Sequence, residues 1–205
     1  VNILGLEKGQ DFARVLNESA NWCGVRKDQP IDLTALDQIK KDRAKKAAAE
    51  EQRERQQRAQ LVADLTAQAK PIEGTPAAAY LAARGITELP AEGLSYLPPI
   101  APRARIMHPR FASCVVWGKD DQGRIVAGQR IVLNKDGTRP DVEEGKPFLA
   151  SPTGNPARFA ARTPDGPLCI AEGPESALSV WMATGFETWA VFGVSNWKTA
   201  PIPTG

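Results

Sequence analysis

The sequence predicts a mixed protein of the α+β and α/β kinds, in which a long N-terminal helix precedes a β-hairpin subdomain and a final β-α-β unit. Three observations support this fold class. Residues 32–69 contain no Gly or Pro that would interrupt a helix. Two runs rich in Val, Ile and Trp, 113–119 and 124–134, flank the turn sequence Asp-Asp-Gln-Gly, which is typical of a β-hairpin. Residues 167–193 contain an apolar run, a helical stretch and a second apolar run.

The N-terminal region is expected to hold two helical segments. The first, in residues 1–30, has apolar residues with the spacing of one helical face and ends at Pro30; these residues are Phe12, Val15, Leu16 and Ala20. Residues 31–70 predict one long charged helix, which Asp32 or Thr34 could cap. Its middle, 40–58, has mixed charge and no large apolar residue, which favours a solvated spacer helix. The alternative is a basic arm that contacts nucleic acid.

Residues 75–165 predict a basic, mixed α and β subdomain. Thr75-Pro76 begins a helix that ends near Gly85, with Pro and Gly at the ends where helices favour them. The hairpin around residues 120–123 follows, and a second turn is expected at 134–137.

Residues 166–205 predict the β-α-β unit. The apolar run 168–171 suits a buried parallel strand, and Pro174 suits the first turn of the following helix. Gly185 would end this helix, and the second strand would span 188–192.

Composition excludes several classes of site. The net charge of +2 gives no global basic field, so any nucleic-acid contact must come from local clusters of Arg and Lys. The three cysteines are far apart and His108 is the only histidine, so no zinc site of close cysteine pairs is expected within the chain. The absence of a long apolar run and of a signal peptide, together with sparse cysteines, predicts a cytoplasmic protein without membrane contact.

The most informative residue is Glu172, because it stands where an apolar strand ends and a helix begins. Ligands of open α/β sheets bind at that position, and a carboxylate there can coordinate Mg²⁺ or transfer a proton. Gly173 would let the backbone turn tightly and leave space at the site. By pattern alone, a helix cap or a surface charge is the more common role for such a Glu.

The segment Ala171-Glu172-Gly173-Pro174-Glu175-Ser176-Ala177-Leu178 resembles the first motif of Toprim domains, which occur in primases, topoisomerases and some nucleases. The resemblance implies a Rossmann-like fold, Mg²⁺ or Mn²⁺ as cofactor, Glu172 as metal ligand or acid/base, and Glu175 as a second metal ligand. The run from Trp189 to Gly193 resembles the second Toprim strand, whose end also lines the site.

Two further segments resemble the polymerase domain of bacterial, phage and plasmid primases. These are Gly128-Gln129-Arg130-Ile131-Val132-Leu133 and Lys146-Pro147-Phe148-Leu149-Ala150-Ser151-Pro152. The resemblance implies that Arg130 and Lys146 bind the phosphates of nucleotides or template. Further local positive charge is expected from Arg124, Arg158 and Lys198. A third segment, 79–86, resembles the Tyr-Leu-x-x-Arg-Gly-Ile helix of the same family, for which we expect a packing role.

The resemblance implies part of a DNA primase, with single-stranded DNA template and nucleoside triphosphates as partners and a helicase as a further candidate. A complete Toprim domain also needs an Asp-x-Asp pair, which this sequence lacks, so we expect no primer synthesis by the chain alone. Two alternatives stay open: a non-catalytic module that binds nucleic acid or protein through a degenerate Toprim fold, and another Toprim enzyme such as a nuclease. A topoisomerase would need a nucleophilic tyrosine, and both tyrosines, Tyr80 and Tyr96, precede the motif.

Overall fold

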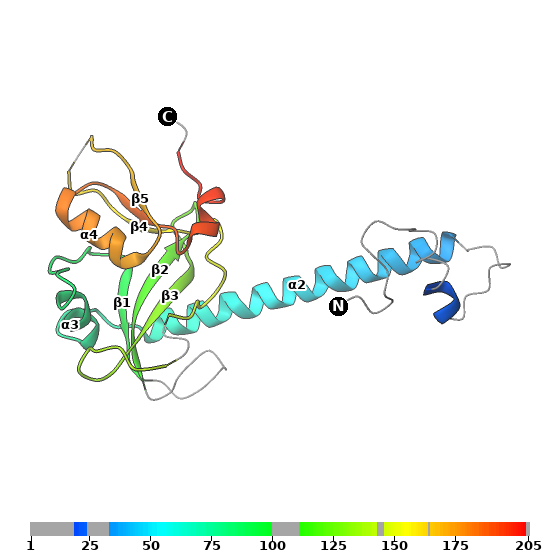
Figure 1. Cartoon of the computed structure of the whole chain (residues 1–205), viewed down its shortest axis with the longest axis horizontal. Coiled ribbons are helices and arrows are strands. Elements are labelled where there is room, and N and C mark those ends of the chain that lie inside the picture. Colours follow the sequence, from blue (N-terminus) through cyan, green and yellow to red (C-terminus); the bar gives the residue numbers. More distant parts are fainter. Residues whose placement is uncertain (1–18, 24–32, 100–110, 143–145, 164, 204–205) are drawn as a thin grey trace. The chain divides into compact units, whose positions relative to one another are not determined.

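The computed structural model describes residues 19–23, 33–99, 111–142, 146–163 and 165–203 (Figure 1). The chain divides into two compact units, Val1–Gln52 and Arg53–Gly205. The predicted apolar face at Phe12, Val15 and Leu16, the cap Asp32 and the lone His108 lie outside the described residues.

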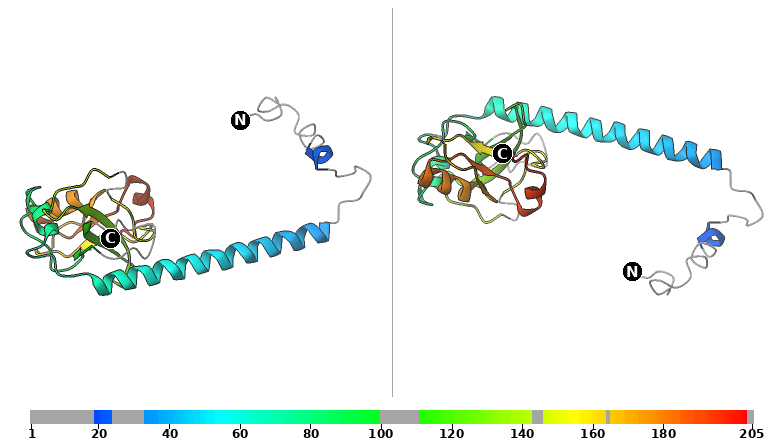
Figure 2. Two further views of the ribbon diagram at one scale, coloured as in Figure 1. Left: turned by 90° about the horizontal axis from the view of Figure 1, so that it is seen from below. Right: turned by 90° about the horizontal axis from the view of Figure 1, so that it is seen from above.

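The long helix α2 spans Leu33–Gln68, which confirms the predicted helix (Figure 2). Residues 37–60 of this helix are exposed on every side. Hydrogen bonds between side chains four residues apart support it, from Gln38 to Asp42 at 3.0 Å and from Arg58 to Glu54 at 3.1 Å. In the last turns of α2 one face is no longer exposed, because Val62 and Leu65 are buried.

The first sheet is antiparallel, with strand order β1-β2-β3. Its strands are β1 (Leu94–Leu97), β2 (Ala112–Lys119) and β3 (Ile125–Leu133), and the last two form the predicted hairpin. Successive side chains of a strand point to opposite faces, so the sheet has two buried faces with different partners. Cys114, Val116 and Ile131 belong to one apolar core, and Val115 and Trp117 belong to another.

Helices cover both faces of this sheet. The short helix α3, Pro76–Ala82, begins at the predicted cap Thr75, whose hydroxyl accepts a hydrogen bond from the Ala77 N–H. Its residues Ala77, Tyr80 and Leu81 pack in the core of Cys114 and Val116. On the other face, Val62 and Leu65 of α2 pack in the core of Val115 and Trp117.

The second sheet holds the expected β-α-β unit. Its strands are β4 (Ala157–Phe159), β5 (Cys169–Ala171) and β6 (Thr188–Ala190), in the order β4-β6-β5. β5 and β6 are parallel and are joined by α4, Pro174–Thr184, which ends at Gly185 in the left-handed conformation. β4 pairs with β6 in the antiparallel sense, and the helix η1, Val194–Lys198, follows β6. α3 and α4 share one core beside the first sheet (Figure 1).

Three elements formed by the described residues were not predicted: β1, β4 and η1. β1 and β4 have only four and three residues, which is too short for an alternating pattern to stand out. Trp117, Trp181 and Trp189 are buried in the cores, whereas Trp22 is 90% exposed. None of the helices formed by the described residues combines the length and the apolar character needed to cross a membrane.

The packing of Leu65 gives a first prediction. Leu65→Ala removes a side chain that is only 2% exposed, so we expect a loss of about 2–5 kcal/mol in the free energy of unfolding. Urea unfolding followed by tryptophan fluorescence measures this change. Gln57→Ala, at an exposed position of the same helix, should shift the midpoint little. Equal stabilities of the two variants would contradict the docking of α2 on the sheet.

Candidate functional site

The candidate site lies where β5 and β6 end. Glu172 directly follows β5, and its backbone carbonyl accepts a hydrogen bond from the Gly193 N–H at 3.1 Å. The Glu172 side chain is exposed, and among the described residues nothing forms a hydrogen bond or ion pair with its carboxylate. The two parallel strands therefore present an accessible carboxylate at their shared carboxyl edge, as predicted for ligand sites of such sheets.

Of the two glycine positions in the predicted site, the backbone conformation requires glycine at only one. Gly193 has φ 131°, a backbone conformation that side chains with a Cβ rarely adopt. Gly173 has φ −110° and ψ 155°, which is extended backbone open to any residue, and a Cβ there would meet nothing within 4 Å. The tight turn therefore lies at Gly193, next to Phe192 with φ 62°, rather than at Gly173.

Glu175 is the centre of the most connected cluster at this edge. It lies in the first turn of α4, and its Oε1 accepts hydrogen bonds from Lys146 Nζ at 2.5 Å and from Tyr80 Oη at 2.8 Å. The three side chains come from segments far apart in the sequence, and the Glu175 and Lys146 side chains are 16% and 35% exposed. The structure thus brings together the predicted metal ligand Glu175 and the predicted phosphate ligand Lys146.

The cluster changes the proton affinities of its members. Burial alone would raise the pKa of Glu175, but the hydrogen bonds from Lys146 and Tyr80 outweigh it and lower the pKa below its usual 4.5. Burial and the hydrogen bond to the Glu175 carboxylate raise the pKa of Tyr80 to about 12. Tyr80 therefore stays a neutral donor and Glu175 a charged acceptor at neutral pH.

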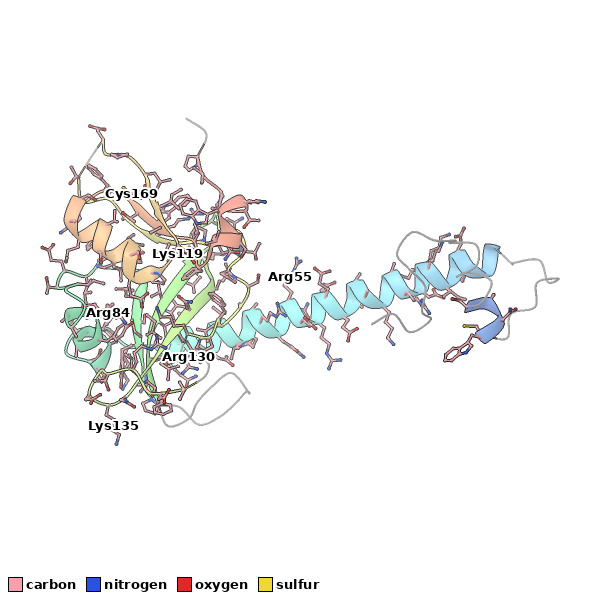
Figure 3. The ribbon with its side chains drawn as sticks, in the orientation of Figure 1. Arg55, Arg84, Lys119, Arg130, Lys135 and Cys169 are labelled. Atoms are coloured by element: carbon pink, nitrogen blue, oxygen red, sulfur yellow. The ribbon has the colours of Figure 1, made fainter. Side chains whose placement is uncertain are left out.

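Two arginines extend the positive charge around Tyr80. The Arg84 guanidinium lies over the Tyr80 ring, 4.8 Å from its centroid, at the end of α3 (Figure 3). The turn before Arg139 packs on α3, because a Cβ at Gly137 would lie 3.3 Å from the Tyr80 amide nitrogen. The charges of Arg84 and Arg139 counteract the rise in the Tyr80 pKa, so both are close enough to act on it. We call Tyr80, Arg84, Arg139, Lys146 and Glu175 the cationic cluster.

Sequence reasoning missed three members of this cluster, Tyr80, Arg84 and Arg139. Tyr80 and Arg84 carried a usable signal, since residues four apart lie on one helical face. Arg139 carried none, because only the tertiary packing of its turn brings it to α3.

Arg130 lies on the other face of the first sheet. It is paired with Val115 in the β-ladder, and Val115 and Trp117 pack against α2 rather than α4. Arg130, labelled in Figure 3, is 1% exposed, and its guanidinium donates hydrogen bonds to Ser113 Oγ at 3.1 and 2.7 Å. Burial lowers the pKa of Arg130 to about 10. The structure does not bring Arg130 to Glu172 or Glu175, and its phosphate contact stays a prediction.

The remaining predicted cations are dispersed. Arg124 forms an ion pair with Asp120 at 2.8 Å, and Arg158 forms one with Asp121 at 3.2 Å while its guanidinium stacks on Trp189. Lys198 is exposed at the end of η1, beyond the carboxyl edge of β6. Trp197 of the same helix is 40% exposed.

The carboxylates at the edge fit Mg²⁺ only in part. Within the described residues there is no cluster of three or more His, Cys, Asp or Glu that could hold a metal. Glu172 and Glu175 could supply two ligands, although Oε1 of Glu175 already accepts two hydrogen bonds. Mg²⁺ commonly binds one or two carboxylates and takes its other ligands from water and substrate phosphates. The edge fits that open type of site and not a cage built by protein alone.

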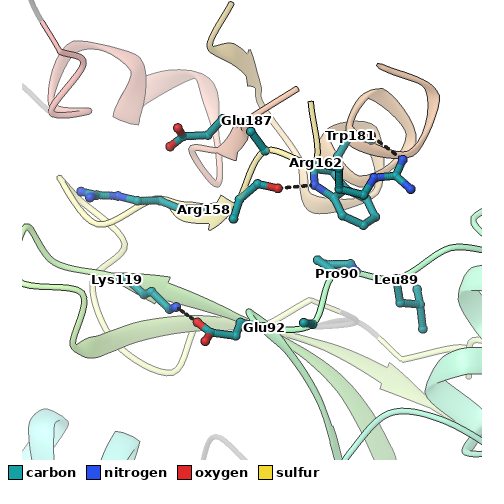
Figure 4. A pocket seen from close by; sticks show the side chains of 11 residues that line it. Leu89, Pro90, Glu92, Lys119, Arg158, Arg162, Trp181 and Glu187 are labelled. Atoms are coloured by element: carbon teal, nitrogen blue, oxygen red, sulfur yellow. Dashed lines mark hydrogen bonds and ion pairs between the residues drawn. The ribbon is translucent and has the colours of Figure 1, made fainter. Parts of the chain in front are cut away.

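A separate pocket of about 640 Å³ lies between the segment 89–92 and the segment 158–162, which includes the end of β4 (Figure 4). Apolar residues of the segment 89–91 and Trp181 line it together with three cations, each already paired with a carboxylate. The pairs are Lys119 with Glu92 at 2.7 Å, Arg158 with Asp121, and Arg162 with Glu88. It shares no lining residue with the cationic cluster.

Comparison with known proteins places the chain in one family. The model of the family described as Domain of unknown function (DUF7146) matches residues 56–159, half of the 205 residues, and the chain belongs to this family. No curated protein and no solved structure was found to match the chain. The matched region contains Tyr80, Arg84, Arg139 and Lys146 and ends before Glu172 and Glu175.

The lowered pKa of Glu175 gives a prediction of pH dependence. The stabilisation by the charged carboxylate is complete above pH 4.5 and is lost as the pH falls through the lower pKa of the folded state. Glu175→Gln should therefore be less stable than the native chain at pH 7, and the difference should shrink towards pH 3. Urea unfolding at a series of pH values measures it.

Glu73→Gln is the matched control, because Glu73 is exposed and forms no hydrogen bond or ion pair among the described residues. The free energy of unfolding of Glu73→Gln should match that of the native chain at each pH. A stability difference for Glu175→Gln that does not change with pH would contradict the charged cluster.

Proposed function

We propose that this chain is part of a DNA primase, acting in metal-dependent nucleotidyl transfer for RNA primer synthesis on a single-stranded DNA template. The supporting observation is the contact between Lys146 and Glu175, because these residues come from two separate motifs that resemble primase segments. Glu172, three residues before Glu175, is exposed at the end of β5.

The cationic cluster suits phosphate binding. Arg84, Arg139 and Lys146 supply three positive charges, and Glu175 neutralises one of them. A planar guanidinium can bind two phosphate oxygens, and an ammonium adds a compact point charge. Arg84 and Arg139 are exposed, so a polyanion can reach them without breaking the contact between Lys146 and Glu175.

Glu172 is the residue we propose for the chemistry. Its carboxylate is open to solvent at the carboxyl edge, where it can bind a cation or accept a proton from an attacking hydroxyl. Bound Mg²⁺ would neutralise charge that develops on the transferred phosphoryl group. Glu175 would hold Lys146 in place and add a second carboxylate to the edge.

A non-catalytic module that binds nucleic acid is the second candidate. One observation favours it: Glu175 is already bonded to Lys146 and Tyr80, and the described residues offer no third carboxylate at this edge. Both candidates require polyanion binding by the cationic cluster, and they differ in the need for metal at Glu172.

Polyanion binding is tested by salt titration. Arg84→Ala and Lys146→Ala should each weaken binding of a fluorescent oligo-dT. Each should also lower the slope of log affinity against log salt by about 0.7, the value for one lost phosphate contact to a single strand. Fluorescence anisotropy measures both quantities. Lys70→Ala is the control, since Lys70 is exposed and lies beside β1, at the opposite edge of the first sheet from β3. An unchanged slope in both test variants would remove the cluster from the nucleic-acid site.

Metal binding separates the two candidates. With ATP present, Mn²⁺ should broaden the backbone NMR signals of residues 172–175 and 193 in the native chain and not in Glu172→Gln. Glu187→Gln is the control, because Glu187 precedes β6 at the other end of the strand and bonds to Trp189. Equal broadening in the native chain and in Glu172→Gln would favour the non-catalytic module.

A further inference from the structure

Gln129 carries a polar atom that the fold leaves without a partner. Its side chain is 9% exposed, and its Oε1 is buried without any hydrogen bond among the described residues. Buried polar atoms of this kind are rare in folded proteins, and each calls for an explanation such as a bound molecule. Its neighbour Arg130 is bonded to Ser113, so within the Gly-Gln-Arg segment the unpaired buried atom belongs to Gln129.

Strand alternation directs Gln129 towards the candidate site. It is paired with Val116, which shares a core with Tyr80 of α3 and Leu178 of α4, whereas Arg130 is on the face of Val115. The charge of Glu175 contributes to raising the pKa of Cys114, after burial, so Glu175 lies over this same face. Of the two polar residues in the Gly-Gln-Arg segment, Gln129 is therefore the one on the side of Glu175 and Lys146.

A partly exposed aromatic ring lies next to Gln129. Phe148 forms an antiparallel bridge with Gln129, so the two side chains are on one side of the sheet. Phe148 is 39% exposed, and its ring forms a T-shaped contact with that of Phe192, which precedes Gly193, with centroids 6.2 Å apart. Lys146 is two residues before Phe148, roughly 6.6 Å along extended chain.

Three kinds of recognition chemistry thus meet within a few residues: a cation, an unpaired hydrogen-bond acceptor and a flat apolar surface. A nucleotide presents the matching groups in the same succession, with charged phosphate, ribose hydroxyl donors and a flat base. An amide oxygen accepts from a hydroxyl, and an aromatic ring can stack on any base.

We propose that Gln129 Oε1 accepts a hydrogen bond from a ribose hydroxyl of a nucleotide whose phosphates contact Lys146 and whose base lies against Phe148. This assignment rests on the proposed function, since it needs nucleotide binding at the cationic cluster. It makes Gln129 the residue that distinguishes ribonucleotides from deoxyribonucleotides. A nucleotide without the hydroxyl leaves the buried acceptor unpaired, and sites of that kind discriminate strongly against such analogues.

The test compares ATP, 2′-deoxyATP, 3′-deoxyATP and 2′,3′-dideoxyATP with Mg²⁺ on the whole chain, by isothermal titration calorimetry. We expect ATP to bind roughly tenfold more tightly than the monodeoxy analogue that lacks the contacted hydroxyl. Gln129→Met keeps the side-chain volume and removes the hydrogen-bond acceptor. The affinities of this variant for the four nucleotides should therefore agree within about twofold and match the affinity of the native chain for 2′,3′-dideoxyATP. Gln122→Met, at an exposed turn position, should discriminate as the native chain does.

The outcomes separate this inference from the proposed function. If none of the four nucleotides binds, both fail. If they bind the native chain equally, the role of Gln129 is overturned and the cationic cluster stands. Discrimination that persists unchanged in Gln129→Met also overturns it. Inosine triphosphate lacks the amino group of the adenine base. If it binds more weakly than either monodeoxy analogue, the contact is with that amino group and the ribose assignment is overturned. The native-chain comparison needs no variant, so equal binding of ATP and its deoxy analogues overturns the assignment even if Gln129→Met fails to fold.

Discussion

The contact of Glu175 with Lys146 and Tyr80 is the interaction on which the candidate site depends. It ties the first turn of α4 to α3 and to the segment next to β3, three parts of the chain that are distant in sequence. A carboxylate this buried is costly unless it is paired and hydrogen-bonded, and here one oxygen receives both an ammonium and a hydroxyl donor. The contact therefore adds a polar link beside the apolar core that α3 and α4 share.

The arrangement also separates the roles of two carboxylates that are three residues apart in the sequence, one at the end of β5 and one in the first turn of α4. Glu175 is committed to internal contacts, and its charge organises Lys146 and Tyr80. Glu172 has no such commitment among the described residues and remains open to solvent. Because Arg84 and Arg139 also lie near Tyr80, the side chains around Tyr80 carry more positive than negative charge. A site of this composition attracts phosphates and keeps one carboxylate available for a cation.

Strand alternation decides which residues of β3 belong to this site. Because neighbouring side chains point to opposite faces, the segment Gly-Gln-Arg divides its two polar residues between the two cores. Arg130 is bonded to Ser113 on the face covered by α2. Gln129 points the other way, next to Phe148, with an acceptor that no described residue satisfies.

Much of the architecture is determined by the sequence alone, because its signals are local. The uninterrupted run 33–68, the hairpin turn at 120–123, and the Pro and Gly at the ends of α4 each act within one element. The carboxylate at the end of β5 is predictable for the same reason, since it follows from the order strand, Glu, helix. Which face of β3 meets α4, the approach of Arg139 to Tyr80, and the pairing of Lys146 with Glu175 were decided only by tertiary structure. These contacts join residues distant in sequence, and strand register and packing, rather than any local pattern, bring them together.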